Sequence, residues 1–424
     1  MVGVWEDRPV LPNQPVYEHL PPQATVSRAE KLAQLREELK NRGADWHFIA
    51  TLDDIAWLFN LRGADVSYLP SFPTRRSSDL RGADVSFNPV FVSFALVNQQ
   101  QATLFVALDK VSAELEQILK DDGVILRDYA EIAVALAAVP GGSSLLVDPA
   151  RVTCGLLDNL HADVRLVEGL NPTTLAKSRK SLDDAVHIRQ AMEQDGAALC
   201  EFFAWLETAL GRERITELTI DEKLTAARAR RPDYVSLSFN TIAAFNANGA
   251  MPHYHATEQE HAVIEGDTTE IYTLSLHDAL PIWADNVNYG HGTGHGVGYF
   301  LNVHEGPQVI AYQAVAAPQT AMQPGMITSI EPGTYRPGRW GVRWGVRIEN
   351  LAMNREAGES EFGEFLRFET LTLCPIDTRC LEPALLTQEE RDWLNGYHVE
   401  VRERLSPWVS GAALEWLNTR TAAI

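Results

Sequence analysis

The nineteen residues from Tyr289 to Pro307, YGHGTGHGVGYFLNVHEGP, constrain the chain most, because they combine three histidines with six glycines. A regular helix or strand disfavours so many glycines, since each costs roughly 0.5 to 1 kcal/mol relative to alanine in an element interior. Imidazole is the commonest transition-metal ligand and a general acid or base near neutral pH. The segment therefore predicts a hydrolytic metal site; the alternative is a glycine-rich turn with surface histidines. A phosphate-binding loop is disfavoured because no Gly-Lys-Ser/Thr follows the glycines.

Two glutamates downstream are candidate partners of these histidines. Glu331 ends the apolar run MITSI before Pro-Gly, and Glu349 lies in VRIEN. Alternate residues of a strand share a face, so we expect Arg347 and Glu349 on one face, with Val346 and Ile348 directed into the core. Arginine beside glutamate is equally consistent with a structural ion pair, and the nearby histidines favour a site. One histidine with two glutamates suits Mn, Zn or Co, and the oxygen-rich balance favours Mn.

Four motifs together resemble aminopeptidase P, the Xaa-Pro aminopeptidase of the pita-bread metallopeptidases. They are GHGTGHGVGYFLNVHEGP, the Glu-Pro-Gly run, RIEN and NANGAMPHY. The resemblance extends from about residue 4 to the C-terminus and corresponds to the cytosolic three-domain form with its first domain absent. It implies an α/β, creatinase-like N-terminal domain followed by an α+β pita-bread catalytic domain that lacks part of its sheet.

The resemblance also implies a ligand set. The family holds two metal ions, with Mn favoured here, through two Asp, one His and two Glu; His295, Glu331 and Glu349 match the last three. It assigns Glu331 as ligand and proton acceptor, and Glu349 as the ligand that bridges the metals. The implied substrate-orienting and intermediate-stabilising residues are His253, His291 and His304, and Arg347 is implied to position Glu349.

Composition limits the classes of partner. The net charge of −21 would repel a phosphate backbone, so we expect no nucleic-acid partner. The N-terminus has prolines and acids where a secretory signal needs a basic start and an apolar run, and no run approaches 18 apolar residues, so we expect no membrane segment and a cytoplasmic location.

Four cysteines without CxxC spacing favour reduced core residues. The charged face of the C-terminal helix fits solvation or a subunit contact equally well, so a homodimer is a possible assembly.

The order of elements predicts two domains after an irregular, proline-rich linker at residues 1–26. A capping box of Ser27 and Glu30 begins a helix that runs to about Arg42 before Gly43, and WHFIA follows as a strand. Alternating strands and helices assign residues 27–170 to the α/β domain. Residues 171–424 are assigned to the pita-bread domain, with outer helices at LDDAVHIRQAMEQDGAALCEFFAWLETAL and IDEKLTAARARR and a strand at DYVSLSF. The C-terminal part predicts a strand at FLRFETLTLCPID and a helix at LTQEERDWLNGYHVEVRERL.

Two segments contradict the rest of the chain. LRGADVS occurs twice, around SFPTRRSSDL, and LSLHDALPI stands directly upstream of the glycine–histidine segment. The DNA string TCTTTCCCTACACGACGCTCTTCCGATCT reads SFPTRRSSD from its first base and LSLHDALPI from its second, and it resembles a sequencing-library adapter. We interpret residues 68–79 and about 268–282 as artefactual insertions. Because surface loops tolerate insertions, we expect residues 68–79 to form an exposed, poorly ordered excursion.

The second insertion adjoins an expected deletion. In the family, an Asp-x-Gly or Asp-Ser-Gly strand and a following Thr-Thr-Asp motif supply both metal aspartates, and neither motif is present between Gly266 and Trp283. We therefore expect this chain to bind at most one metal, weakly, and to be inactive.

The stretch WGVRWGVR is a third irregularity, because it repeats four residues between the two glutamates. Glu331 and Glu349 are 18 positions apart; without one copy the separation is 14, the spacing that the resemblance implies. A shift of four preserves strand parity, so Glu349 keeps its face. A loop at residues 336–339 is expected to take up the excess.

Together these observations predict a metallo-exopeptidase that releases the N-terminal residue from peptides with proline second. The alternatives are a non-catalytic pita-bread binding scaffold, because the same fold hosts other functions, and an Xaa-Pro dipeptidase. The retained His295, Glu331 and Glu349 argue against a scaffold by ancestry, and the missing aspartates argue for inactivity of this chain.

Overall fold

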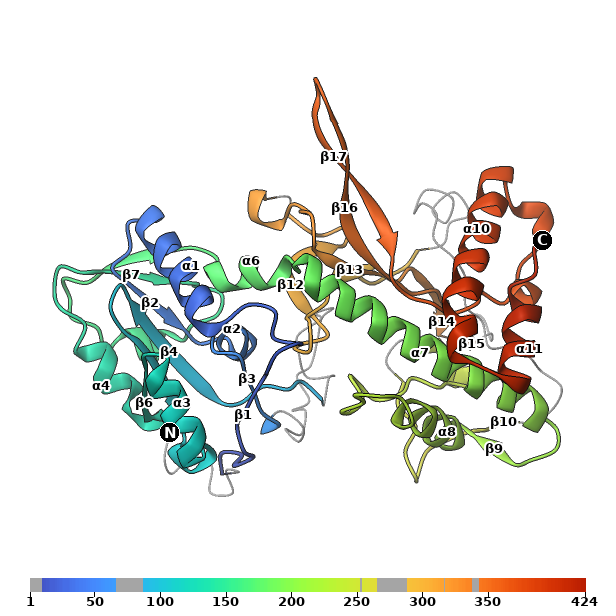
Figure 1. The fold of residues 1–424 in the computed structure, drawn as a ribbon, viewed down its shortest axis with the longest axis horizontal. Helices are drawn as coiled ribbons and strands as arrows, with labels where there is room; N and C mark the ends of the chain where they lie inside the picture. Colours follow the sequence, from blue (N-terminus) through green and yellow to red (C-terminus); the bar gives the residue numbers. More distant parts are fainter. Residues whose placement is uncertain (1–9, 66–86, 252–253, 265–287, 316, 338–342) are drawn as a thin grey trace. The chain divides into compact units, whose positions relative to one another are not determined.

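The structure is a computed structural model that describes residues 10–65, 87–251, 254–264, 288–315, 317–337 and 343–424 (Figure 1). The described residues form two compact units. The first contains residues 10–65, 87–179 and 298–307, and the second contains the remaining described residues from 180 onward. The predicted excursion at residues 68–79 and the interpreted insertion at about 268–282 lie outside the described residues.

The first unit is built on a six-stranded mixed sheet in the order β6-β5-β4-β2-β7-β8. Its strands are β2 (Trp46–Ile49), β4 (Ser93–Asn98), β5 (Ala102–Val106), β6 (Val124–Asp128), β7 (Ser144–Val147) and β8 (Arg165–Glu168). The pairs β2–β7, β7–β8 and β5–β6 are parallel, and β4 is antiparallel to both β2 and β5. A two-stranded ribbon pairs β1 (Tyr17–Glu18) with β3 (Leu61–Arg62).

The helices of the first unit are α1 (Arg28–Asn41), α2 (Leu52–Leu58), α3 (Ala113–Asp121), α4 (Ile132–Ala137), α5 (Cys154–Leu157) and α6 (Pro172–Ser178). The expected capping box is confirmed: Ser27 accepts from the Glu30 amide, and the Glu30 carboxylate accepts from Ser27 in return. This satisfies amides that a helix start leaves without partners.

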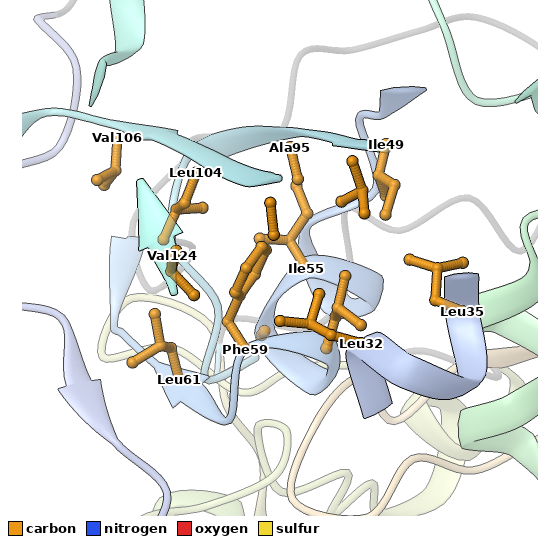
Figure 2. Packing of buried hydrophobic residues seen from close by; sticks show 14 of the residues in the cluster. Leu32, Leu35, Ile49, Ile55, Phe59, Leu61, Ala95, Leu104, Val106 and Val124 are labelled. Carbon is orange, nitrogen blue, oxygen red and sulfur yellow. The ribbon is translucent and has the colours of Figure 1, made fainter. Parts of the chain in front are cut away.

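Hydrophobic residues cover both faces of this sheet, as period-two alternation requires. Ala95 and Val97 of β4 pack in one cluster with α1 and α2, whereas Leu96 between them packs in another with α4. Figure 2 shows the first cluster, in which Ile55 and Phe59 lie among strand residues that include Leu104 and Val124. Both faces are therefore buried, which explains the continuous apolar runs of these strands.

The second unit contains a five-stranded sheet in the order β12-β11-β13-β16-β17. Its strands are β11 (Gly294–Gly296), β12 (Glu305–Ile310), β13 (Ile327–Ile330), β16 (Asn350–Ser360) and β17 (Gly363–Thr370). Two short ribbons pair β9 (Ile215–Thr216) with β10 (Val263–Ile264), and β14 (Gly333–Pro337) with β15 (Arg343–Arg347). The helices are α7 (Leu182–Ala209), α8 (Glu217–Ala229), α10 (Gln388–Leu405) and α11 (Gly411–Arg420), and a 3-10 turn, η4, spans Asn246–Ala250.

The predicted strand at DYVSLSF is wrong. Residues 234–239 form no strand, and Val235 and Phe239 are exposed, because this apolar run finds no partner strand among the described residues. The four cysteines are free, as expected, but only Cys200 is fully buried and Cys154 is exposed. None of the described helices is both long and apolar enough to cross a membrane.

Candidate metal centre

Strand β11 carries His295 between two glycines, and the first of these glycines has a steric role. A Cβ atom at Gly294 would lie 2.2 Å from the carbonyl oxygen of Ser329, so a larger residue would push β11 away from β13. The two strands pair with Gly296 opposite Thr328. Glycines are disfavoured in regular structure, but here they allow β11 to pair closely with β13. His295 is therefore held on a strand of the sheet.

His295 is buried, at 6% exposure, and each of its polar groups has a defined neighbour. Its backbone amide donates to Ser329 Oγ at 2.9 Å, and its Nδ1 atom lies 2.8 Å from the carbonyl oxygen of Gly296. A carbonyl oxygen only accepts, so Nδ1 carries the proton, and in the neutral ring Nε2 presents a lone pair. That Nε2 atom lies 3.2 Å from Oε1 of Glu331.

Glu331 follows directly after β13 and is 7% exposed. Its amide donates to Thr293 O at 2.8 Å, its Oε1 accepts from Ser329 Oγ at 3.1 Å, and its Oε2 lies 3.2 Å from Nη1 of Arg347. Ser329 thus contacts both His295 and Glu331, a role that the sequence analysis missed. The signal was present, because Ser329 stands two residues before Glu331 and so shares its strand face.

Glu349 lies between β15 and β16, next to the buried Ile348. Glu349 is exposed as a whole residue, but its carboxyl group is surrounded by protein. This burial and the Glu331 carboxylate raise the pKa of Glu349 to about 7, and the charge of Arg347 lowers it. A like charge and desolvation both disfavour the ionised form. The charged groups of Glu331, Arg347 and Glu349 are therefore close enough to interact, although Glu349 itself lies outside the strands.

The repeated WGVR lies partly in the β14–β15 hairpin. Gly333 pairs with Arg347 and Pro337 with Arg343, so the base of the hairpin keeps Arg347 beside Glu331. Residues 336 and 337 belong to β14 and not to the expected loop at residues 336–339, and the other two residues of that loop lie outside the described residues. How the four extra residues are accommodated therefore stays a prediction.

The other predicted histidines are placed as follows. The Nδ1 and Nε2 atoms of His291 face the carbonyl oxygens of Gly292 and Gly333, the latter at 3.1 Å, and its ring makes an edge contact with Tyr335. His304 is half-buried in residues 298–307, which belong to the first unit. His253 lies outside the described residues, and its role stays a prediction.

The residues present fit part of a divalent metal site. The Nε2 lone pair of His295 and an acceptor oxygen of Glu331 face each other, an arrangement that a cation would stabilise. Within the described ranges, however, no group of three His, Cys, Asp or Glu side chains is arranged to hold a metal ion. The set found here is an incomplete ligand shell, with Arg347 supplying positive charge to Glu331.

A second charged cluster, built around the buried Lys177 in the first unit, was not anticipated. Lys177 Nζ lies 2.9 Å from Asp53, 3.7 Å from Asp54 and 3.0 Å from Glu305. Glu305 neighbours His304 in the sequence, and in the same segment Phe300 O accepts from Arg62 Nε at 2.7 Å. Residues 298–307, which carry His304, are thus held within the first unit by the ion pair between Lys177 and Glu305 and by the hydrogen bond from Arg62 to Phe300 O.

Comparisons with family models cover most of the chain. Residues 7–74 and 78–183 match the creatinase/prolidase N-terminal domain, and residues 186–273 and 275–355 match metallopeptidase family M24. Residues 364–424 match the C-terminal region of that peptidase family.

Individual proteins give the same picture. The chain is 32% identical to a probable Xaa-Pro aminopeptidase P of Sordaria macrospora, over 99% of this chain and 76% of the relative. It is 31% identical to Xaa-Pro aminopeptidase 1 of Dictyostelium discoideum, over 92% and 68%. The crystal structure of X-prolyl aminopeptidase from Caenorhabditis elegans, described as a cytosolic enzyme with a di-nuclear active site, matches at a TM-score of 0.85 and 25% identity, over 99% of this chain and 75% of that one.

Proposed function

The chain belongs to the Xaa-Pro aminopeptidase family of M24 metallopeptidases, with a creatinase-like domain followed by a pita-bread domain, and from this we propose both its ancestral reaction and its present state. The ancestral reaction is metal-assisted release of the N-terminal residue from peptides with proline second. The chain as encoded is inactive. The 3.2 Å distance between His295 Nε2 and Glu331 Oε1 supports the first statement, because the motifs predict both residues as ligands of one site.

The roles follow from the contacts. His295, Glu331 and Glu349 would hold divalent metal, with Mn favoured by the oxygen-rich set. Bound metal of this kind lowers the pKa of a water toward neutrality and polarises the scissile carbonyl. Glu331 accepts the proton. Arg347 was expected to position Glu349; its Nη1 lies 3.2 Å from Glu331 Oε2, so we propose that it also holds the Glu331 carboxylate in place.

The imidazole groups complete the arrangement. His253, His291 and His304 orient the peptide and donate hydrogen bonds to the developing oxyanion. Both ring nitrogens of His291 face carbonyl oxygens, those of Gly292 and Gly333, so His291 donates to a substrate only after its Nε2 leaves the Gly333 carbonyl.

Inactivity follows from a missing block. The alignment to the Sordaria relative spans 488 positions, whereas this chain has 424 residues, so that relative carries residues without counterpart here. We place the loss between Gly266 and Trp283, beside the adapter-like residues, where the family's two metal aspartates are expected. At most one metal then binds, because two carboxylates do not neutralise two divalent ions and an uncompensated buried charge costs several kcal/mol.

The remaining parts of the proposal concern organisation. We assign residues 1–26 to a linker, 27–170 to the creatinase-like domain and 171–424 to the pita-bread domain, and we place the protein in the cytoplasm.

We also propose a homodimer. Its support is the β16–β17 hairpin, whose apolar side chains are exposed to solvent: Phe362, Phe365, Leu366 and Phe368. Sedimentation equilibrium tests this, and a concentration-independent monomer would reject it.

A restored chain tests the ancestral reaction. Both adapter-like segments are replaced by an uninterrupted family sequence, and hydrolysis of Ala-Pro-Ala, Ala-Ala-Ala and Ala-Pro is measured with Mn. We expect turnover of Ala-Pro-Ala and silence on Ala-Ala-Ala. Equal turnover of both tripeptides would refute the proline requirement, cleavage of the dipeptide alone would indicate a dipeptidase, and peptide binding without any turnover would indicate a scaffold.

A further inference from the structure

Glu217 is a buried carboxylate at the first position of α8 that the reaction described above does not use. It is 1% exposed. Its Oε1 accepts from the Phe245 amide at 2.6 Å and from Asn248 Nδ2 at 3.0 Å, and its Oε2 accepts from the Tyr254 hydroxyl at 2.6 Å and the Ala262 amide at 2.7 Å. Each carboxylate oxygen therefore has at least two donors.

These donors belong to one stretch of chain. All four residues lie between positions 245 and 262, which hold NANGAMPHY and only one short turn, η4, among the described residues. A segment with so little regular structure leaves backbone and side-chain donors without helix or sheet partners. Glu217 supplies the shared acceptor that gathers them.

Helix capping does not explain this arrangement. A carboxylate in the first turn of a helix ordinarily favours the helix dipole and accepts from the helix's own amides. Here Thr216 performs that role, because its hydroxyl accepts from the Thr219 amide at 3.1 Å. The contacts of Glu217 are directed away from α8, to the 245–262 segment.

The segment in turn meets the hairpin beside the metal ligands. A Cβ atom at Gly345 would lie 2.0 Å from the carbonyl oxygen of Gly249, so the backbones of β15 and η4 are in direct contact. Two residues further along β15 stands Arg347, which contacts Glu331. Displacement of η4 would therefore reach Arg347 through backbone contact.

We propose that Glu217 is a positioning residue of the peptide site, which holds residues 245–251 and 254–262 against the β14–β15 hairpin and thereby fixes the position of Arg347 beside Glu331. The inference that these residues face a peptide rests on the function proposed above. The attachment of residues 245–262 to α8 depends only on the contacts of Glu217. It requires a carboxylate, because an amide at this position would turn an NH₂ group toward two donors whichever way it rotates.

Tyr254 provides a spectroscopic reporter of this attachment. Burial, the hydrogen bond to Glu217 and the charges of Glu217 and Glu260 raise the pKa of Tyr254 to about 12. At pH 11 a phenol with that pKa is about one-tenth ionised. Removing the Glu217 charge lowers the pKa, so the ionised fraction of this one tyrosine rises.

The experiment compares Glu217→Gln with Glu222→Gln, an exposed glutamate on the same helix. The ionisation of Tyr254 is followed by NMR of its ζ carbon, assigned with Tyr254→Phe, and amide exchange is followed across the chain. In Glu217→Gln we expect the Tyr254 pKa to fall by at least one unit, and residues 245–262 and β15 to exchange at least tenfold faster, with α7 and α10 unchanged. Glu222→Gln should change neither.

Two results would overturn the proposal. One is an unchanged Tyr254 pKa with unchanged exchange, and the other is faster exchange spread evenly over α7 and α10, which marks a merely structural residue. If Glu217→Gln does not fold, Asn248→Ala decides, since it removes one donor and keeps the carboxylate. Asn248→Ala should accelerate amide exchange in η4 and β15 and leave the pKa of Tyr254 unchanged. Amide exchange equal to that of the unaltered protein would reject the proposed role of Glu217. These readouts need no hydrolysis, so they stand or fall apart from the proposed reaction.

Discussion

The Nε2 atom of His295, on β11, and the Oε1 atom of Glu331, directly after the adjacent strand β13, lie 3.2 Å apart. The Nδ1 atom of His295 is held by Gly296 O, so the ring orientation is set by the backbone rather than by a metal. Ligand orientation by a neighbouring hydrogen bond is a general feature of metal sites. The remnant of the site is thus preorganised even where its ligand shell is incomplete.

Ser329 should be required for this preorganisation. It is fully buried, accepts from the His295 amide and donates to Glu331 Oε1. Replacement by alanine leaves a buried amide and a carboxylate oxygen with one partner fewer, so Ser329→Ala should lower the free energy of unfolding by about 1 to 3 kcal/mol. Urea unfolding measures this. Ser410→Ala, at an exposed position with no side-chain cap bond, is the control and should change it little.

Lys177 should be essential for the stability of the first unit. Removing its charge leaves Asp53, Asp54 and Glu305 buried without their cation, so Lys177→Met should cost about 3 to 5 kcal/mol in the free energy of unfolding. Lys40→Met removes an exposed surface ion pair and should cost less than about 1 kcal/mol.

The loss caused by Lys177→Met should depend on pH. Burial raises the pKa of both aspartates and the charge of Lys177 lowers it, so that the pKa of Asp53 is lowered overall and that of Asp54 is raised overall. Without the lysine, these carboxyl groups have a higher pKa in the folded protein than in the unfolded chain. Their contribution to the free energy of unfolding therefore decreases as pH rises. The variant should therefore be closer to the unaltered protein at pH 5 than at pH 8, and a larger deficit at pH 5 would contradict the assigned cluster.

His47 should make the first unit sensitive to acid. Burial lowers its pKa to about 4, with a smaller opposing effect from the bond to Leu146 O, and its Nε2 has no hydrogen-bond partner among the described residues. A folded-state pKa below the unfolded value gives stability that is present at neutral pH and lost as pH falls below about 6.5. Between pH 7.5 and pH 5 the unaltered protein should lose about 2 kcal/mol more than His47→Gln does. Parallel pH curves for the two proteins would count against a neutral buried imidazole.

Local signals in the sequence predicted local structure well. The Ser27–Glu30 box fixed the start of α1, and the apolar run before Pro332 fixed β13, because capping and strand periodicity act within a few residues. The shared face expected for Arg347 and Glu349 stays a prediction, because Glu349 lies beyond β15, which ends at Arg347.

Long-range polar contacts were not predictable in this way. Lys177 meets Glu305, far along the chain, and Glu217 gathers donors from residues 245–262. Each looks like an ordinary surface charge in the sequence, because only the tertiary fold shows that it is buried and paired. The absent strand at DYVSLSF is the converse case: its apolar pattern was present, but strand formation also needs a partner edge.

The number of metals bound by the chain as encoded decides whether the metal site is incomplete. Purified protein is titrated with Mn by calorimetry, its metal content is counted after dialysis, and Ala-Pro-Ala hydrolysis is assayed with His295→Ala as the control. We expect no more than one weakly held metal per chain, lost in His295→Ala, and no measurable hydrolysis. Two tightly bound metals with turnover would show that Asp267, Asp285 or another acid has replaced the lost aspartates, and would contradict the proposed inactivity.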